Sequence, residues 1–225
     1  MKKRIERPGV CAGYDRWSKT YDNTPNPLVA LDRRHTMRSL SPQRGEYVLD
    51  VACGTGQHLK SISQRGSRAV GLDFSRAMLS VARRQCPHAP LIYADLETEW
   101  PFPHEDFDAI LCSLVGEHIN NLAVFFQQAC AALKPGGRFV FSVFHPELVA
   151  AGIESNFAES GVEYRLGAIP HTTADYLEKM DAAGFRRHRF TEFVGDEELV
   201  HEVPQAKKYL NRPLLLVIEA QREMS

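Results

Sequence analysis

Short apolar runs alternate with amphipathic helical patterns from residue 47 onward. The apolar runs lie at 47–52, 68–74, 90–96, 107–115 and 138–144, and helical patterns cover 58–66, 76–86 and 121–134. Alternation of strands with helices is typical of a parallel sheet that carries helices on both faces. We therefore predict an α/β fold with a Rossmann-like sheet.

The C-terminal quarter departs from this alternation. A helical pattern over 172–185 begins at a threonine cap, Thr172 or Thr173, and ends at Gly184. Two strand-like runs follow at 185–194 and 212–220, with no helical crossover expected between them. Pro213 begins the second run, where a missing N–H is tolerated. We expect these two strands to pair antiparallel as a large hairpin.

Two further segments do not fit the sheet pattern. Residues 1–40 read as loop and helix and carry the aromatics Tyr14, Trp17 and Tyr21, whereas residues 145–171 mix Gly, Pro, His and Asn. Ligands of such sheets bind outside the carboxyl ends of the strands. We predict one domain over 1–225, with an N-terminal lid (1–40), a core (41–144), a cap insertion (145–171) and a C-terminal helix and strands (172–225).

Composition and charge narrow the classes of partner that this chain is expected to bind. The 225 residues carry 27 basic and 28 acidic side chains, so no basic surplus favours nucleic acid. No apolar run reaches transmembrane length, and the charged start lacks the apolar stretch of a signal peptide. The five cysteines show neither Cys-x-x-Cys nor zinc spacing. We expect a cytoplasmic protein with a small-molecule substrate and no metal site, and the sequence leaves monomer and homodimer both open.

The stretch YVLDVACGTGQH, 47–58, places Gly54 and Gly56 between a strand and a helix. Such a turn lets the backbone approach a ligand, but a dinucleotide loop would carry a third glycine where this chain has Leu59. Acids stand at three consecutive strand ends, Asp50, Asp73 and Asp95. Asp50 would repel a pyrophosphate and attract a cationic ammonium, and Asp73 is placed to accept from ribose hydroxyls.

The chain resembles class I S-adenosylmethionine-dependent methyltransferases, especially the small-molecule branch typified by ubiquinone and menaquinone methyltransferases. The matching pieces are YDRWSKTYD (14–22), LDVACGTG (49–56), VGLDFSRAML (70–79), YADLE (93–97), FDAILCS (107–113) and LKPGGRFVFSVF (133–144). The resemblance implies S-adenosyl-L-methionine as cofactor, S-adenosyl-L-homocysteine as product, and a seven-stranded sheet of order 3-2-1-4-5-7-6 with strand seven antiparallel.

The resemblance also implies which residues hold the cofactor. The methionine part would lie against Asp50, the loop from Ala52 to Gly56 and Ser113, with Asp73 on the ribose. Ala52 stands where the family often has glycine, which we interpret as tolerated variation. The complete implied set is Tyr21, Asp50, Ala52, Cys53, Gly54, Thr55, Gly56, Asp73, Phe74, Met78, Ala94, Asp95, Leu96 and Ser113.

Four side chains are candidates for the catalytic step. Glu117 and His118 follow the fourth strand, and histidine is the side chain that exchanges protons near neutral pH. His145 follows the fifth strand, and Tyr14 lies in the lid. The alternatives are a solvated Glu117, a packed His118, a structural His145 and a lid-packing Tyr14.

The leading hypothesis is methyl transfer to a small, apolar or aromatic metabolite, with carbon, oxygen or nitrogen as acceptor. The segment CSLVGEH (112–118) lacks the Asn-Pro-Pro-Tyr type of motif used on bases and protein amides. A non-catalytic S-adenosylmethionine-binding protein would carry the same loop. A nicotinamide-dependent oxidoreductase is a further alternative, against which Asp50 and the absent third glycine argue.

Overall fold

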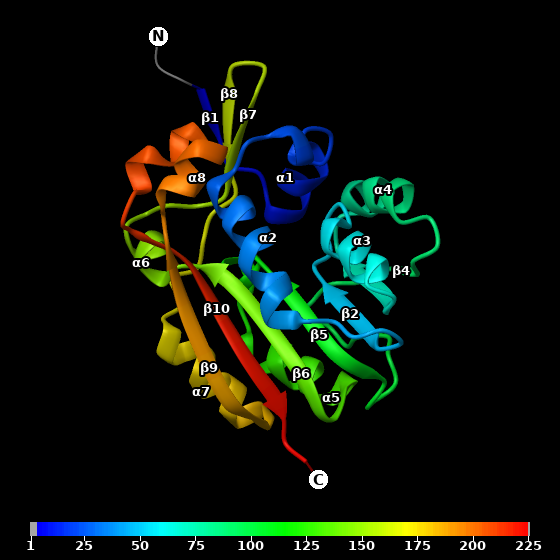
Figure 1. Ribbon diagram of the computed structural model, residues 1–225. Coiled ribbons are helices and arrows are strands. Elements are labelled where there is room, and N and C mark those ends of the chain that lie inside the picture. The colour runs from blue at the N-terminus through cyan, green and yellow to red at the C-terminus, as the bar shows by residue number, and fades with distance from the viewer. Residues whose placement is uncertain (1–3, 225) are drawn as a thin grey trace.

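The computed structural model describes residues 4–224 and is built around one seven-stranded sheet (Figure 1). Its strands run in the order β4-β3-β2-β5-β6-β10-β9, which is 3-2-1-4-5-7-6 when counted within the sheet. The first five pair in parallel, and β10 is antiparallel to both β6 and β9. This confirms the predicted order. The strands are β2 (Tyr47–Val51), β3 (Arg68–Asp73), β4 (Leu91–Tyr93), β5 (Phe107–Ser113), β6 (Leu133–Phe144), β9 (Phe185–Val194) and β10 (Pro213–Arg222).

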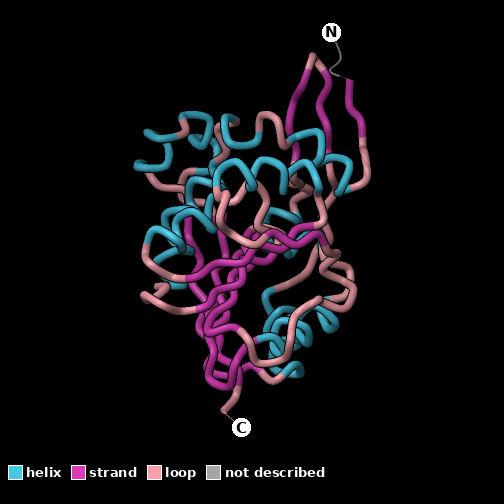
Figure 2. Tube along the Cα trace, turned by 90° about the vertical axis from the view of Figure 1, so that its right-hand side faces the viewer, coloured by secondary structure: helices cyan, strands magenta, loops and turns pink. Residues whose placement is uncertain are grey.

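Helices cover both faces of the sheet because the strands are apolar on both sides (Figure 2). On β2, Leu49 and Val51 pack in the core that holds α5 (Leu122–Ala132) and α7 (Thr173–Ala183). Val48, which points to the opposite face, packs in the core that holds α2 (Pro27–Leu40) and α3 (Gln57–Gln64). The remaining helix of the predicted alternation, α4 (Arg76–Gln85), lies beside β3 and β4.

The connection between β9 and β10 differs from the predicted plain hairpin. The two strands pair antiparallel, but the chain between them forms α8 (Glu197–Glu202) and the 3₁₀ helix η3 (Pro204–Tyr209). Leu199, Val203 and Ala206 are buried there against the α2 side of the core. These three apolar residues are spaced four and three apart, which is the helical signal that the sequence contained.

The lid and cap segments form a second, smaller sheet at one end of the molecule (Figure 1). Strand β1 (Arg4–Glu6) pairs in parallel with β8 (Val162–Arg165), which forms a hairpin with β7 (Asn156–Glu159). The same region holds α1 (Val10–Trp17), the 3₁₀ helices η1 (Tyr21–Asn23) and η2 (Gly116–His118), and α6 (Pro146–Ala150). The prediction of residues 1–40 as loop and helix missed β1. The assignment of these segments as a lid and a cap stays a prediction.

No helix among residues 4–224 is both long enough and apolar enough to cross a membrane.

Candidate functional site

The glycine loop between β2 and α3 is held in an unusual backbone conformation. Ala52, Gly54 and Gly56 all have positive φ, at 58°, 53° and 86°. The N–H of Gly54 donates to Asp73 Oδ2 at 2.8 Å, so the end of β3 fixes the loop. Glycine adopts such φ values freely and alanine does not, which gives the physical reason for the family's preference for glycine at position 52.

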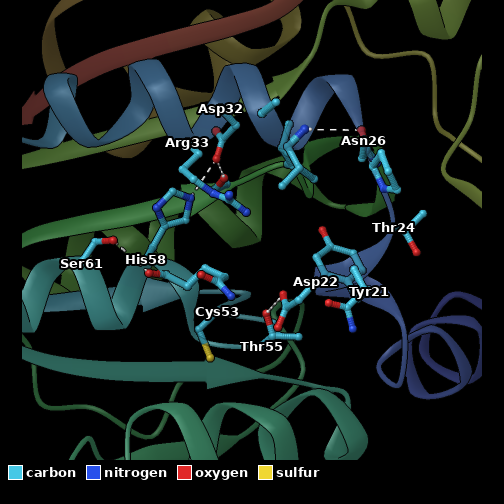
Figure 3. A pocket seen from close by; sticks show the side chains of 18 of the residues that line it. Tyr21, Asp22, Thr24, Asn26, Asp32, Arg33, Cys53, Thr55, His58 and Ser61 are labelled. Carbon is cyan, nitrogen blue, oxygen red and sulfur yellow. Dashed lines mark hydrogen bonds and ion pairs between the residues drawn. The ribbon is translucent and has the colours of Figure 1, made fainter. Parts of the chain in front are cut away.

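A cavity of about 300 Å³ opens beside this loop, and we call it the loop cavity (Figure 3). Figure 3 shows α2 on one side of it, the loop and α3 on the other, and Tyr21 with Asp22 at one end. Of the predicted cofactor residues, the structure brings to this cavity Tyr21, Ala52, Cys53, Gly54, Thr55 and Ser113. Gly56 does not line it and lies against α4, where a Cβ atom would come within 3.1 Å of Ala82 Cβ.

Two of the predicted acids are buried beneath the loop rather than exposed in the cavity. Asp50 is 1% exposed, and burial raises its pKa to about 7. Asp73 is 6% exposed, and burial raises its pKa to about 6 although the N–H groups of Ser75 and Gly54 donate to its two oxygens. Burial therefore disfavours the charged form of both groups, and a cation bound at the loop would favour their ionisation.

The predicted cofactor residues that follow β3 and β4 or lie in α4 are outside the loop cavity. Asp15 of α1 accepts hydrogen bonds from Ser75 Oγ and from the N–H of Ala77, so α1 lies over the start of α4. Asp95 is exposed and its Oδ1 accepts from the N–H of Glu97 at 3.0 Å. The predicted residues that do not line the loop cavity on this side are Phe74, Met78, Ala94, Asp95 and Leu96.

Three of the four predicted catalytic residues meet in one buried group, which we call the Tyr14 cluster: Tyr14, Glu117, His118 and Ser155. Tyr14 Oη lies 3.1 Å from His118 Nε2 and 3.5 Å from Ser155 Oγ, which in turn lies 3.4 Å from Glu117 Oε1. Glu117 is 1% exposed, and its Oε2 has no hydrogen-bond partner among the described residues. Burial raises the pKa of Tyr14 well above its usual value, so its hydroxyl stays protonated.

The fourth catalytic candidate, His145, lies apart from this cluster. Its Nδ1 accepts from the N–H of Glu147 at the start of α6, and its Nε2 lies 3.1 Å from Glu192 Oε1. Both ring nitrogens therefore have partners within the protein. The geometry is that of a helix-capping histidine, and its catalytic role stays an untested prediction.

Sequence reasoning missed a buried polar network centred on Asp32 of α2. Asp32 is 2% exposed and accepts from Thr36, Ser113 and Ser142 at 2.5–2.6 Å, with His58 Nε2 at 2.8 Å. Burial opposes ionisation of Asp32, but the hydrogen bond and the charge of the His58 ring, together with the hydrogen bonds from Ser113 and Ser142, outweigh burial and lower the pKa of Asp32. Burial likewise disfavours a charged His58, but Asp32 raises the pKa of that ring. This pair ties α2 to α3 and to the ends of β5 and β6.

The site retains hydrogen-bonding capacity that the protein does not use. Among residues 4–224, Asp50 Oδ2, Glu117 Oε2 and Trp17 Nε1 are buried without a partner. Unpartnered buried polar atoms are rare in native proteins, and two of these three are carboxylate oxygens that attract a cation. A donor that carries a sulfonium and an ammonium group therefore fits the residues present.

Comparison with known proteins places the chain in a family. A model of the methyltransferase domain matches residues 49–141. A ubiquinone biosynthesis O-methyltransferase of Ralstonia nicotianae is 31% identical over 169 residues, which cover 72% of this chain and 68% of that protein. The chain belongs to the S-adenosylmethionine-dependent methyltransferases. The cofactor of this methyltransferase is S-adenosylmethionine, as the sequence resemblance implied.

Another curated relative is matched over a smaller part of its length. A demethylmenaquinone methyltransferase of Tropheryma whipplei (strain Twist) is 35% identical over 144 residues, covering 61% of this chain, and the match spans only 60% of that relative. A solved S-adenosylmethionine-dependent methyltransferase from Mesorhizobium loti superposes with a TM-score of 0.74 at 24% identity, over 88% of this chain and 100% of that one. This second likeness establishes the fold.

Proposed function

We propose that this methyltransferase moves a methyl group from S-adenosylmethionine to a small, apolar, aromatic molecule of the quinol or phenol class. The observation that carries the proposal is the buried Tyr14 cluster beside the glycine loop. The ring of Tyr14 lies 6.4 Å from that of Tyr21, which lines the loop cavity. The names of the relatives, a demethylmenaquinone methyltransferase and a ubiquinone biosynthesis O-methyltransferase, support a quinone-related acceptor.

The donor supplies an activated methyl group on a sulfonium. The residues that would hold it are Tyr21, the loop from Ala52 to Thr55 and Ser113, because these line the loop cavity. The buried carboxylate of Asp50 favours the donor's positive charge from beneath the loop. Burial of the Tyr14 cluster keeps water away from the reacting groups.

Glu117 and His118 are proposed to accept the proton that the acceptor loses. Their side chains lie 3.8 Å apart at the end of β5, and both are buried. Tyr14 positions the His118 ring through its 3.1 Å contact with Nε2. A positioned acid–base group of this kind contributes about 10²- to 10⁴-fold to a rate.

The proposal is tested by incubating the protein with methyl-labelled S-adenosylmethionine and a panel of quinols, phenols, amines and carboxylic acids. We expect label in the quinol or phenol products. Glu117→Gln and His118→Gln should lower kcat by at least about 10²-fold and leave the affinity for S-adenosylmethionine unchanged. His104→Gln serves as the matched control because His104 is exposed and lies outside the cluster.

Three outcomes would contradict parts of this proposal. If the protein binds S-adenosylmethionine and label never leaves it, the chain is a binding protein without transferase activity. If amines alone are methylated, the acceptor class is wrong. If both variants turn over like the wild type, alignment of the reactants suffices and the acid–base assignment fails.

A further inference from the structure

One cationic side chain in the wall of the loop cavity lacks an acidic partner. Among the residues that the structure describes, the two lining side chains that can carry positive charge are Arg33 and His58. His58 Nε2 lies 2.8 Å from Asp32 Oδ2, so its charge is matched within the protein. The side chain of Arg33 makes no ion pair or hydrogen bond within residues 4–224. Its guanidinium is therefore free to bind an anion.

Three acids line the same cavity, and each already has a partner within the protein. Asp22 Oδ1 accepts a hydrogen bond from Thr55 Oγ1 at 2.7 Å. Glu202 pairs with Arg34 at 3.3 Å, and Asp32 lies at the centre of the buried network described above. The free guanidinium is thus available to an anionic group of a bound ligand.

The geometry of α2 turns Arg33 toward the glycine loop. Asn26, Val29 and Ala30 line the cavity together with Arg33, and their spacing places all four on one face of the helix. Arg34, one position later, turns instead toward α8, where Asp196 and Glu202 pair with it and leave it 13% exposed. Figure 3 shows the Arg33 side chain reaching from α2 into the space between that helix and the glycine loop.

The charges of the donor complement the two sides of this cavity. S-adenosylmethionine carries a sulfonium, an ammonium and a carboxylate. Asp50 Oδ2, which is buried without a partner beneath the loop, is matched to the positive groups. The carboxylate requires hydrogen-bond donors, and a guanidinium can bind it through two parallel hydrogen bonds. Arg33 offers this group from the α2 side.

We propose that Arg33 binds the α-carboxylate of the donor's methionine and thereby selects donors that carry this carboxylate. Arg33 is thus a specificity-determining residue of the donor site. The proposal rests on the cofactor that the family uses, and neither on the class of acceptor nor on an acid–base role of Glu117. The sequence stretch LDRRH indicates only a helix surface at Arg33, because the cavity exists only once α2 packs beside α3.

The test uses calorimetry at low ionic strength on the full chain. It compares S-adenosylhomocysteine with decarboxylated S-adenosylhomocysteine, which keeps the amine and lacks the carboxylate. The ratio of the two dissociation constants reports recognition of the carboxylate. We expect Arg33→Gln to lower this ratio about 3- to 10-fold, as loss of a partly exposed, charge-assisted contact provides. The affinity for the decarboxylated probe should not fall, because Arg33 repels its ammonium. Arg33→Lys keeps the charge without the planar fork and should lower the ratio less.

Arg38→Gln is the matched control, because Arg38 is an exposed residue of the same helix outside the loop cavity, and it should keep the wild-type ratio. An unchanged ratio in Arg33→Gln would overturn the proposal. An equal fall in Arg38→Gln would do the same, because it would reveal a general effect of net charge.

Circular dichroism reports whether each variant is folded. If Arg33→Gln is not, the wild type alone decides, because the ratio of a partly exposed ion pair should fall as ionic strength rises. A ratio independent of salt would then overturn the proposal. Failure of the proposed function would show differently, as intact selection of the carboxylate without methyl transfer to quinols or phenols.

Discussion

At the scale of single residues, the backbone of Ala52 is the clearest departure from what its side chain prefers. Its φ of 58° lies in the left-handed region, which costs an L-residue about 1 kcal/mol. Ala52→Gly removes that strain and adds back some entropy of the unfolded chain. We expect the free energy of unfolding to rise by up to about 1 kcal/mol, measured by urea denaturation.

Ala123→Gly gives the matched comparison for this prediction. Ala123 is the second residue of helix α5, where glycine lowers stability by up to about 1 kcal/mol. The two substitutions should therefore shift the urea midpoint in opposite directions. A loss of stability in Ala52→Gly equal to that in Ala123→Gly would show that the loop does not strain residue 52.

Asp50 gives a pH-dependent prediction at the same scale. Its pKa rises on folding from 3.8 to about 7, mainly through burial. The folded chain therefore binds more protons than the unfolded chain in this window, and the free energy of unfolding falls as pH rises through it. Asp50→Asn removes this titration. The free energy of unfolding of Asp50→Asn, relative to the wild type, should be higher at pH 8 than at pH 5 by about 2.6 kcal/mol, measured by urea unfolding without cofactor. A difference from the wild type that is the same at both pH values would contradict the assignment.

At the scale of elements, helix α2 is anchored by the hydrogen bonds of Asp32 as well as by its apolar face. Asp32→Asn leaves His58 without its charged partner, and we expect unfolding to become about 3 kcal/mol easier. The lowered pKa of Asp32 makes its contribution present above pH 3.8 and lost as pH falls. The raised pKa of His58 makes its contribution full below pH 6.5 and lost as pH rises. The loss should therefore be greatest between these two values.

Ser142→Ala provides a graded control, because it removes one donor to Asp32 and leaves the pair with His58 in place. Its cost should be about 1 kcal/mol, with little dependence on pH. Chemical denaturation from pH 4 to pH 9 measures both variants. Equal costs for Asp32→Asn and Ser142→Ala across this range would refute a stabilising contribution of the Asp32–His58 pair beyond that of one hydrogen bond.

The elements also show which parts of the fold and of the site can be predicted from the sequence. The runs of β2, β3, β5 and β6 are apolar on both faces, and such runs predict strands buried in a parallel sheet. The order of these strands was predicted from the family resemblance. Strand β1 has three residues and forms only by pairing with β8, more than 150 positions later. Asp32 lies in the polar stretch LDRRH, which reads as a helix surface. Only the packing of α2 on two strand ends turns that stretch into a buried network.

At the scale of the whole molecule, the N-terminal segment and the segment after β6, which we predict to act as lid and cap, are joined to each other. Strand β1 adds to the β7–β8 hairpin, and Arg7 makes two hydrogen bonds to Glu154. A separate aromatic and apolar cluster of Trp17, Phe157, Tyr164 and Leu166 holds α1 against the hairpin. Motion that opens α1 from α4 must therefore move the hairpin as well.

This coupling predicts the response of the chain to cofactor. S-adenosylhomocysteine should slow amide hydrogen exchange in α1 and in β7–β8 together. The amides of β9, which forms the edge of the large sheet opposite β4, should keep their rates. Arg7→Gln cuts the ionic link, so exchange in β7–β8 should slow less on binding and exchange in α1 as much as before. Mass spectrometry of peptic fragments measures all three regions. Slowing of α1 with no change in β7–β8 of the wild type would mean that the lid closes without the cap.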